Sequence, residues 1–253
     1  MKYNLDNPIA VRKTKTIYRD NDKTIKVFNE NYSKSDILNE ALNHARVEEN
    51  TNLNMPKLLE VTKIDGKWAI VYSYVEGTPL SVLMQQNPDK IDEYLELFVD
   101  IQMEILGNRV QLLNRIKDKF KRKLTASSEF DDTIRYELLQ RLDGMKDHTK
   151  LCHGDFNPSN IIIKDDGSYA IIDWAHVTQG NASADCARTY LLFSIDGKDN
   201  LADKYMKLFS EKSGIDMRNI QRWIPIVAAT QLTKGIEEEK DFLHKWINVL
   251  DYE

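Results

Sequence analysis

The run His-Gly-Asp-Phe-Asn-Pro-Ser-Asn, at positions 153–160, has residue types and spacing suited to phosphoryl transfer, and Asp173 follows it. That reaction needs an oriented acceptor hydroxyl and a metal ion that neutralises the phosphates. Magnesium prefers hard oxygen ligands, which Asn160 and Asp173 can supply. The carboxylate of Asp155 can accept the hydroxyl proton. The run therefore predicts one base and two magnesium ligands.

The segments that follow this run explain how its side chains can be brought together. Short apolar stretches at 161–163 and 169–172 predict a β-hairpin directly after it. A hairpin returns the chain beside its start, so Asn160 and Asp173 are expected to converge. A turn fixed between ordered elements can also hold Asp155 rigidly.

Two further hairpins are predicted in the first part of the chain. One joins the β-favouring stretches 16–19 and 24–28, and the other joins 57–64 and 67–75. The dipeptide Asp-Gly at 65–66 is a strong two-residue turn signal for the second hairpin. This part of the chain therefore predicts a small antiparallel sheet.

Helical patterns account for most of the remainder. Ser33 and Asp36 form a capping pair that opens a helix ending by about Asn50. From residue 80 to 146, and again after the hairpin that precedes Asp173, apolar residues recur at helical spacing. The predicted fold class is α+β, with a small sheet lobe carrying one helix and a larger, mainly helical lobe.

Composition and charge exclude several classes of protein. The 253 residues are 42% apolar and 30% charged, which is typical of a globular protein, and the formal net charge is −5. The N-terminus lacks the apolar core of a signal peptide, and no stretch approaches the length of a membrane span, so we expect a cytoplasmic protein without a membrane partner. The densest basic run, 117–123, is interpreted as a solvated helix face, and no nucleic-acid partner is expected. Cys152 and Cys186 are expected to be free thiols.

The chain resembles the aminoglycoside phosphotransferase and choline kinase family along nearly its whole length. The run 153–160 resembles the family's catalytic loop, and Ile-Ile-Asp-Trp at 171–174 resembles its metal-binding motif. The resemblance implies a two-lobed, protein-kinase-like fold, with lobes at 1–75 and 76–253 and a hinge at about 72–78. It also implies Mg²⁺, ATP or GTP as phosphate donor, a small hydroxyl-bearing substrate, and a monomer or dimer.

The same resemblance assigns roles to individual residues. Lys26 would hold the α- and β-phosphates, with Glu40 as its helical partner. His153 would mainly orient the catalytic loop beside the base Asp155, and Asp185 would brace that loop. In the hinge, the backbone would contact the adenine edge at Ser73, Tyr74 and Val75.

One segment departs from the expected pattern. The phosphate-covering turn falls at 11–16, which contains no glycine, and this leaves Lys13, Thr14 and Lys15 as side-chain substitutes. The short interval between Asp173 and Asp185 leaves no room for a peptide-docking activation segment, which argues against a protein kinase.

Three functions remain open at this stage. The leading hypothesis is a kinase for a hydroxyl group of an aminoglycoside, a choline-like amino alcohol, a sugar or a related metabolite. A nucleotide-binding pseudokinase and a metal-dependent hydrolase using His153, Asp155 and Asp173 are the alternatives. The acceptor is expected near acidic and aromatic residues that would suit a cation, namely Trp223, Gln231, Glu237, Glu238, Glu239 and Asp241. The acidic run 237–240 can also be a solvated helix cap.

Overall fold

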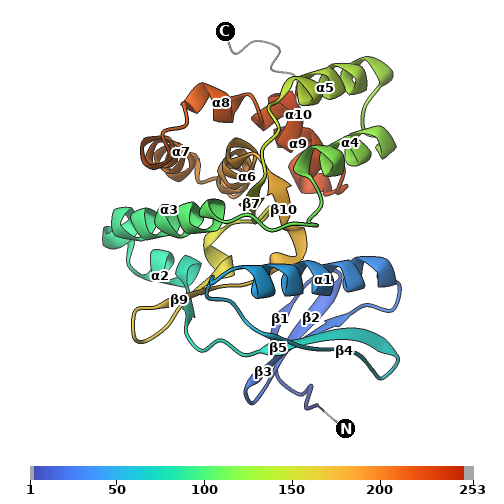
Figure 1. Ribbon diagram of the computed structural model, residues 1–253, viewed down its shortest axis with the longest axis vertical. Helices are drawn as coiled ribbons and strands as arrows, with labels where there is room; N and C mark the ends of the chain where they lie inside the picture. Colours follow the sequence, from blue (N-terminus) through green and yellow to red (C-terminus); the bar gives the residue numbers. More distant parts are fainter. Residues whose placement is uncertain (1–2, 248–253) are drawn as a thin grey trace. The chain divides into compact units, whose positions relative to one another are not determined.

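The computed structural model describes residues 3–247, which fall into two compact units (Figure 1). The first unit is the chain up to Pro88 together with Pro158–His176, and the second is Asp89–Asn157 together with the described residues from Val177 onward. The hairpin after the catalytic loop, which we placed within the helical part of the chain, therefore belongs with the β-rich unit. The lobe limits 1–75 and 76–253 and the hinge at 72–78 stay predictions.

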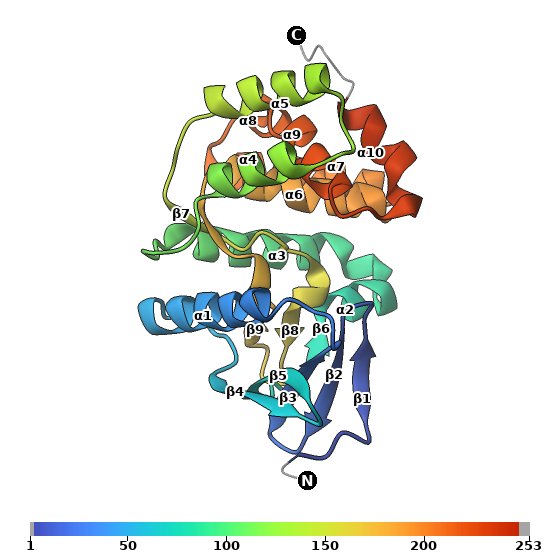
Figure 2. The same cartoon turned by 90° about the vertical axis from the view of Figure 1, so that its right-hand side faces the viewer.

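The first unit is built on a five-stranded antiparallel sheet, whose strands are seen with α1 in Figure 2. Its order is β1-β2-β3-β5-β4, and the strands are β1 Pro8–Val11, β2 Lys15–Asp20, β3 Lys23–Phe28, β4 Leu58–Ile64 and β5 Lys67–Ser73. Both predicted hairpins are present, whereas β1 was not predicted. Asp65 and Gly66 both have positive φ, at 48° and 82°, which is the conformation that a two-residue hairpin turn requires.

Alternation along β3 places its side chains in two separate cores. Ile25 and Val27 pack with Tyr3, Ala69 and Val71 on one face of the sheet. Phe28 packs on the other face, in the cluster that includes Ile37 and Ala41 of α1, Lys34–Asn50. Because successive side chains point to opposite faces, Lys26 shares the α1 face with Phe28. The helix begins beside Ser33, whose side chain accepts a hydrogen bond from the amide of Asp36, as the capping pair predicted.

A second, three-stranded sheet completes the first unit. It has the order β6-β8-β9, from β6 Thr78–Pro79, β8 Ile161–Ile163 and β9 Tyr169–Ile171, and helix α2, Leu80–Gln86, follows β6. Gly77 lets β6 approach β8, because a Cβ built on it would lie 2.3 Å from the carbonyl oxygen of Ile163. The amide of Ile171 donates to the carbonyl of Asn54, which ties the hairpin to the segment before β4.

The second unit is mainly helical. Its helices are α3 Ile91–Gly107, α4 Ile116–Ala126, α5 Asp132–Gly144, α6 Ala182–Ile195, α7 Asp199–Ser213, α8 Met217–Gln221, α9 Ile224–Leu232 and α10 Lys240–Ile247. Strands β7, Lys150–Cys152, and β10, Thr178–Gly180, pair antiparallel and were not predicted. Helix α6 lies between other elements, in contact with α7, α8, α9 and β7 (Figure 1).

These two units confirm the predicted α+β class, a small antiparallel sheet with one helix and a larger helical part. No helix within residues 3–247 has the length and apolar character needed to cross a membrane. Cys152 and Cys186 are free and buried.

Candidate active site

Lys26 is held between two carboxylates inside the first unit. Its ammonium lies 2.5 Å from Glu40 Oε1 on α1 and 3.1 Å from Asp173 Oδ1, which follows the β8–β9 hairpin. Burial alone would favour the neutral amine, but Asp173 and Glu40 outweigh it and raise the pKa of Lys26 well above its usual value. The lysine is therefore a fixed, charged group on the α1 face of the sheet.

Asp173 also has a second cation nearby. Lys15 Nζ lies 3.5 Å from its Oδ2, and although burial opposes ionisation, Lys26 and Lys15 together hold the pKa of Asp173 well below its usual range. Asp173 has a positive φ of 61°, an uncommon conformation for a non-glycine residue that costs about 1–3 kcal/mol and is typical of functional sites. The adjacent Trp174 fixes this conformation, because its buried indole donates to the carbonyl of Ile171 at 3.0 Å.

Asn160 and Asp173 lie at the same end of the β8–β9 hairpin. Asn160 ends the short helix η2, Pro158–Asn160, and its carbonyl accepts a 2.9 Å hydrogen bond from the amide of Ile172, beside Asp173. An ionised carboxylate and an amide at one place are a hard oxygen donor set that fits Mg²⁺. Within residues 3–247 no group of three or more His, Cys, Asp or Glu side chains is arranged to hold a metal ion.

The glycine-free turn between β1 and β2 is held by its own hydrogen bonds. The amide of Arg12 donates to the carbonyl of Lys15 at 2.9 Å, and the side chain of Asn29 donates to the carbonyl of Lys13 at 2.8 Å. Lys13 and Thr14 are exposed, whereas Lys15 is half-buried and reaches Asp173. Of the three proposed substitutes for a glycine loop, Lys15 is the one that the structure brings to Lys26 and Asp173.

The predicted adenine-binding segment follows β5. The amide of Ser73 donates to the carbonyl of Lys57 at 2.9 Å, and the amide of Tyr74 donates to the carbonyl of Asp22 at 2.7 Å. Both donors are therefore already used within the first unit. An adenine edge at this segment would have to be met by backbone carbonyls or by the amide of Val75.

The catalytic loop belongs to the second unit, where α6 holds its backbone. Gly154 has a φ of 77°, which favours glycine, and its amide donates to Oδ1 of Asp185 at 2.8 Å. The hydroxyl of Thr189, one turn further along α6, donates to the carbonyl of Phe156 at 2.7 Å. Burial raises the pKa of Asp185, although the Gly154 amide opposes this shift. These contacts agree with the bracing role predicted for Asp185.

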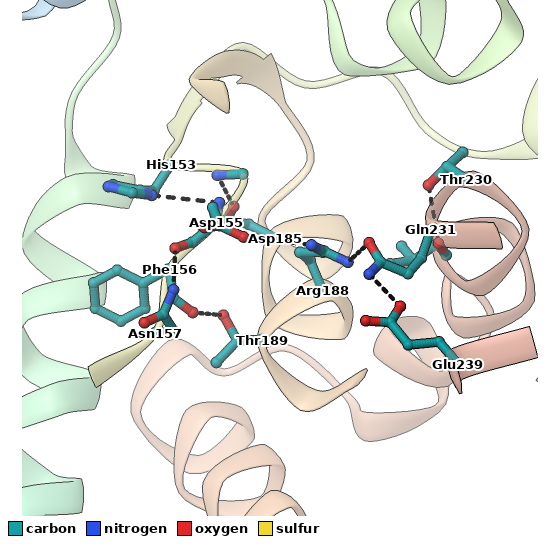
Figure 3. Close-up of polar contacts among 12 residues, drawn as sticks. His153, Asp155, Phe156, Asn157, Asp185, Arg188, Thr189, Thr230, Gln231 and Glu239 are labelled. Carbon is teal, nitrogen blue, oxygen red and sulfur yellow. Dashed lines mark hydrogen bonds and ion pairs between the residues drawn. The ribbon is translucent and has the colours of Figure 1, made fainter. Parts of the chain in front are cut away.

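His153 lies completely buried beside the loop. Its Nδ1 accepts a hydrogen bond from the amide of Asp155 at 3.3 Å, and its ring meets Phe156 edge-on (Figure 3). A side chain without exposed surface is suited to fixing the loop rather than to meeting a substrate. This geometry favours the orienting role over that of a base.

Asp155 is oriented by a chain of polar side chains that begins at Arg188, for which the sequence left open a pairing with an acidic group or a plain surface position. Arg188 on α6 donates to Asp155 Oδ1 at 3.3 Å and to Gln231 Oε1 at 2.6 Å, and Gln231 in turn donates to Glu239 at 2.6 Å (Figure 3). Arg188 is only 9% exposed, so the alternative of a surface arginine is wrong. The guanidinium fixes one oxygen of the carboxylate and thereby its direction.

Several residues that we expected around the acceptor make other contacts in the structure. Trp223 is 2% exposed and packs edge-on against Phe120, so it belongs to the core. Glu237 pairs with Lys240 at 3.0 Å in the turn before α10, which favours the helix-capping alternative for this acidic run. Gln231 is present at the site, but as the partner of Arg188.

This fold, with a lysine held between a helical glutamate and an aspartate, defines a phosphotransferase of the protein-kinase-like class. A family model described as the phosphotransferase enzyme family matches residues 22–223. The chain therefore belongs to this phosphotransferase family, which confirms the predicted resemblance. No curated protein matches the chain significantly.

Solved structures share the fold at low sequence identity. Aminoglycoside phosphotransferase APH(4)-Ia matches with a TM-score of 0.66 and 13% identity, over 94% of this chain and 88% of that one. The GDP complex of a mutant aminoglycoside 2'-phosphotransferase-IIIa has a TM-score of 0.61 and 16% identity, covering 96% and 90% of the two chains. Choline kinase LicA from Streptococcus pneumoniae gives 0.61 and 12%, covering 94% and 86%. At these identities the likeness establishes the fold alone.

Proposed function

We propose that this protein transfers the γ-phosphoryl group of ATP or GTP to a hydroxyl group of a small molecule. The observation that carries the proposal is Lys26, fixed between Glu40 and Asp173 with Asn160 at the same end of the hairpin. Such a lysine is suited to holding phosphates, and two adjacent oxygen ligands are suited to a magnesium ion that bridges them. Structures of APH(4)-Ia contain ADP or AMP-PNP, and the IIIa enzyme contains GDP, which supports a nucleotide donor here.

Within the first unit, each side chain has a distinct task in this proposal. Lys26 and Lys15 place positive charge where the phosphates bind, and Glu40 keeps Lys26 in position. Asn160 and Asp173 hold Mg²⁺, which, when bound, neutralises charge on the phosphates. The Asp173 carboxylate, ionised under all ordinary conditions, is ready to act as a ligand without first losing a proton.

In the second unit, Asp155 is proposed to accept the proton of the acceptor hydroxyl. Arg188 fixes Oδ1 of this carboxylate, and the hydrogen bond from the Asp155 amide to His153 fixes its backbone. Positioning and charge neutralisation then supply most of the rate enhancement.

A pseudokinase that binds nucleotide without transfer is the second candidate. Its motivation is the turn at 11–16, which offers no glycine for close approach of backbone amides to phosphate. Lys15 reaches Asp173 from that turn and supplies a side chain in place of the missing amides, and Lys26, Asp155, Asn160 and Asp173 are all present. We therefore favour an active enzyme.

Turnover assays separate the two candidates. The protein is incubated with Mg²⁺ and ATP or GTP and a panel of hydroxyl compounds, and product formation is measured for the wild type, Asp155→Ala and the control Asp165→Ala. Asp165 is exposed in the β8–β9 turn. Loss of a general base should lower turnover about 10²- to 10⁴-fold, with nucleotide binding retained.

Two outcomes would count against the proposal. Full turnover in Asp155→Ala would show that this residue is not the base. Nucleotide binding that is independent of magnesium, together with no turnover for any acceptor, would favour the pseudokinase.

A further inference from the structure

A continuous line of polar contacts leads from Asp155 to the turn that follows α9. Arg188 Nη2 donates to Asp155 Oδ1 at 3.3 Å, and Nη1 of the same guanidinium donates to Gln231 Oε1 at 2.6 Å. Gln231 Nε2 then donates to Glu239 Oε2 at 2.6 Å (Figure 3). The two contacts farther from Asp155 are the shorter ones, so Gln231 holds the guanidinium more closely than the carboxylate that it orients.

The middle of this line is withdrawn from water. Arg188 is 9% exposed and Gln231 is 4% exposed, and every residue of the helix that carries Gln231, Ile224–Leu232, is buried. A polar side chain in such surroundings is costly unless its groups form hydrogen bonds. Gln231 meets this requirement through both ends of its amide, one toward Arg188 and the other toward Glu239.

The charges at the two ends of the line fix the orientation of the Gln231 amide. Its oxygen faces the cation of Arg188, and its nitrogen faces the carboxylate of Glu239. The reverse orientation would set an NH₂ group against a guanidinium, which only donates, and an oxygen against a carboxylate, which only accepts. Hydrogen bonds to charged groups are also stronger than those between neutral groups. Glu239 therefore holds the amide, and the amide holds the guanidinium.

The turn after α9 brings Glu239 back beside Gln231, which lies eight residues earlier. Gly235 has a φ of 64°, a conformation that is common where a helix ends and the chain reverses. The amide of Glu239 donates to the carbonyl of Ile236 at 3.2 Å, within the short helix η4, Glu237–Glu239. The half-buried Glu239 side chain is thus carried by an ordered turn.

We propose that Gln231 and Glu239 are positioning residues for the phosphoryl transfer, because they fix the guanidinium of Arg188 and through it the direction of the Asp155 carboxylate. This inference rests on the proposed function, since it concerns the base of that reaction. The two residues act through Arg188. The turn after α9, where the sequence led us to expect the acceptor, thereby helps to orient the base.

Steady-state kinetics of single variants test the line from its far end. Gln231→Leu removes both amide contacts at similar volume, and Glu239→Ala removes the outer contact. We expect kcat to fall about 10-fold and about 3-fold, respectively, with the nucleotide KM unchanged, because the direction of the base affects the chemical step. Glu239→Gln, which keeps an oxygen acceptor, should lose less than Glu239→Ala.

Matched controls come from the exposed face of α5 in the same unit. Gln140→Leu and Glu137→Ala repeat the two changes of side chain at exposed positions, and both should leave kcat unchanged. Circular dichroism shows whether each variant is folded. If Gln231→Leu does not fold, Glu239→Ala, at a half-buried position, carries the same test.

A double variant distinguishes positioning through Arg188 from a general structural role. Once Arg188 is replaced by Met, Gln231→Leu should cause no further loss of kcat, because the effects of residues that act as a unit are not additive. Arg188→Lys should lose nearly as much as Arg188→Met, because an ammonium lacks the planar fork with which a guanidinium meets two acceptors. Losses that multiply in the double variant, or full activity in Gln231→Leu, would overturn the inference.

Crystal structures of the wild type and of Gln231→Leu give a readout that does not need turnover. In the variant, the contact between Arg188 and Asp155 should be lost or divided among several conformers, and an unchanged contact would also overturn the inference. Failure of the proposed function has a different signature. In that case the wild type yields no phosphorylated product with any acceptor, and the two crystal structures alone decide whether Gln231 fixes Arg188.

Discussion

Lys26→Met is the substitution that best tests the reasoning about the first unit. Lys26 is 5% exposed and contacts Glu40 and Asp173, so the substitution leaves two carboxylates without their shared cation. Methionine fills a similar volume, which limits the effect of a cavity. The expected result is a loss of stability caused by unpaired charge.

The magnitude follows from the two contact distances. At an effective dielectric constant of about 20, charges 2.5 Å and 3.1 Å apart attract by roughly 7 and 5 kcal/mol, and desolvation of the buried groups cancels much of this. Removing one partner of a buried pair costs about 3–5 kcal/mol. Because Asp173 is 29% exposed and keeps Lys15 as a neighbour, we expect a loss of about 3 kcal/mol.

This loss should depend on pH with a definite sign. The pKa of Asp173 is lowered in the folded protein, so its stabilising contribution is present above its unfolded value of about 4 and is lost as the pH falls. The pKa of Lys26 is raised, so the contribution of the cation persists up to high pH. The difference between wild type and variant should therefore be constant near neutral pH and shrink below about pH 4.

Urea unfolding of the variants in a double-mutant cycle checks the size of this loss and its dependence on pH. Lys26→Met, Glu40→Gln and the double variant are compared with the wild type, with equal m-values as the test that one transition is measured. Neutralising Glu40 should recover part of the loss, giving a coupling energy of about 2 kcal/mol. Additivity within about 0.5 kcal/mol, or a loss below about 1 kcal/mol, would refute the view that Lys26 is held by buried charge.

A further prediction concerns the second unit. Replacing Arg188 by Met should lower kcat about 10- to 100-fold with little change in nucleotide affinity, because the guanidinium orients Asp155; steady-state kinetics with an unchanged kcat would contradict this.

The contact between Lys26 and Glu40 was accessible to sequence reasoning because both residues lie in regular elements. Strand alternation separates Lys26 from Ile25 and Val27, and helical spacing places Glu40 next to the apolar face of α1. The hairpin pattern likewise predicted that Asn160 and Asp173 share one end. Local periodicity is sufficient wherever the partners belong to short, strongly patterned segments.

Arg188 shows where such reasoning stops. Helix α6 is buried on nearly all sides, so its sequence carries no polar stripe from which an exposed or buried position can be read. The partners of Arg188 are Asp155 and Gln231, which are far from it in sequence, and only tertiary packing makes them neighbours.

The surroundings of the α4 lysines could not be predicted for a related reason. The run 117–123 was interpreted as one solvated helix face, so the half-buried Lys119 and Lys123 were indistinguishable from Lys121, which is exposed. Helix α4 contacts α9 in the folded protein, and this long-range packing cannot be read from local periodicity.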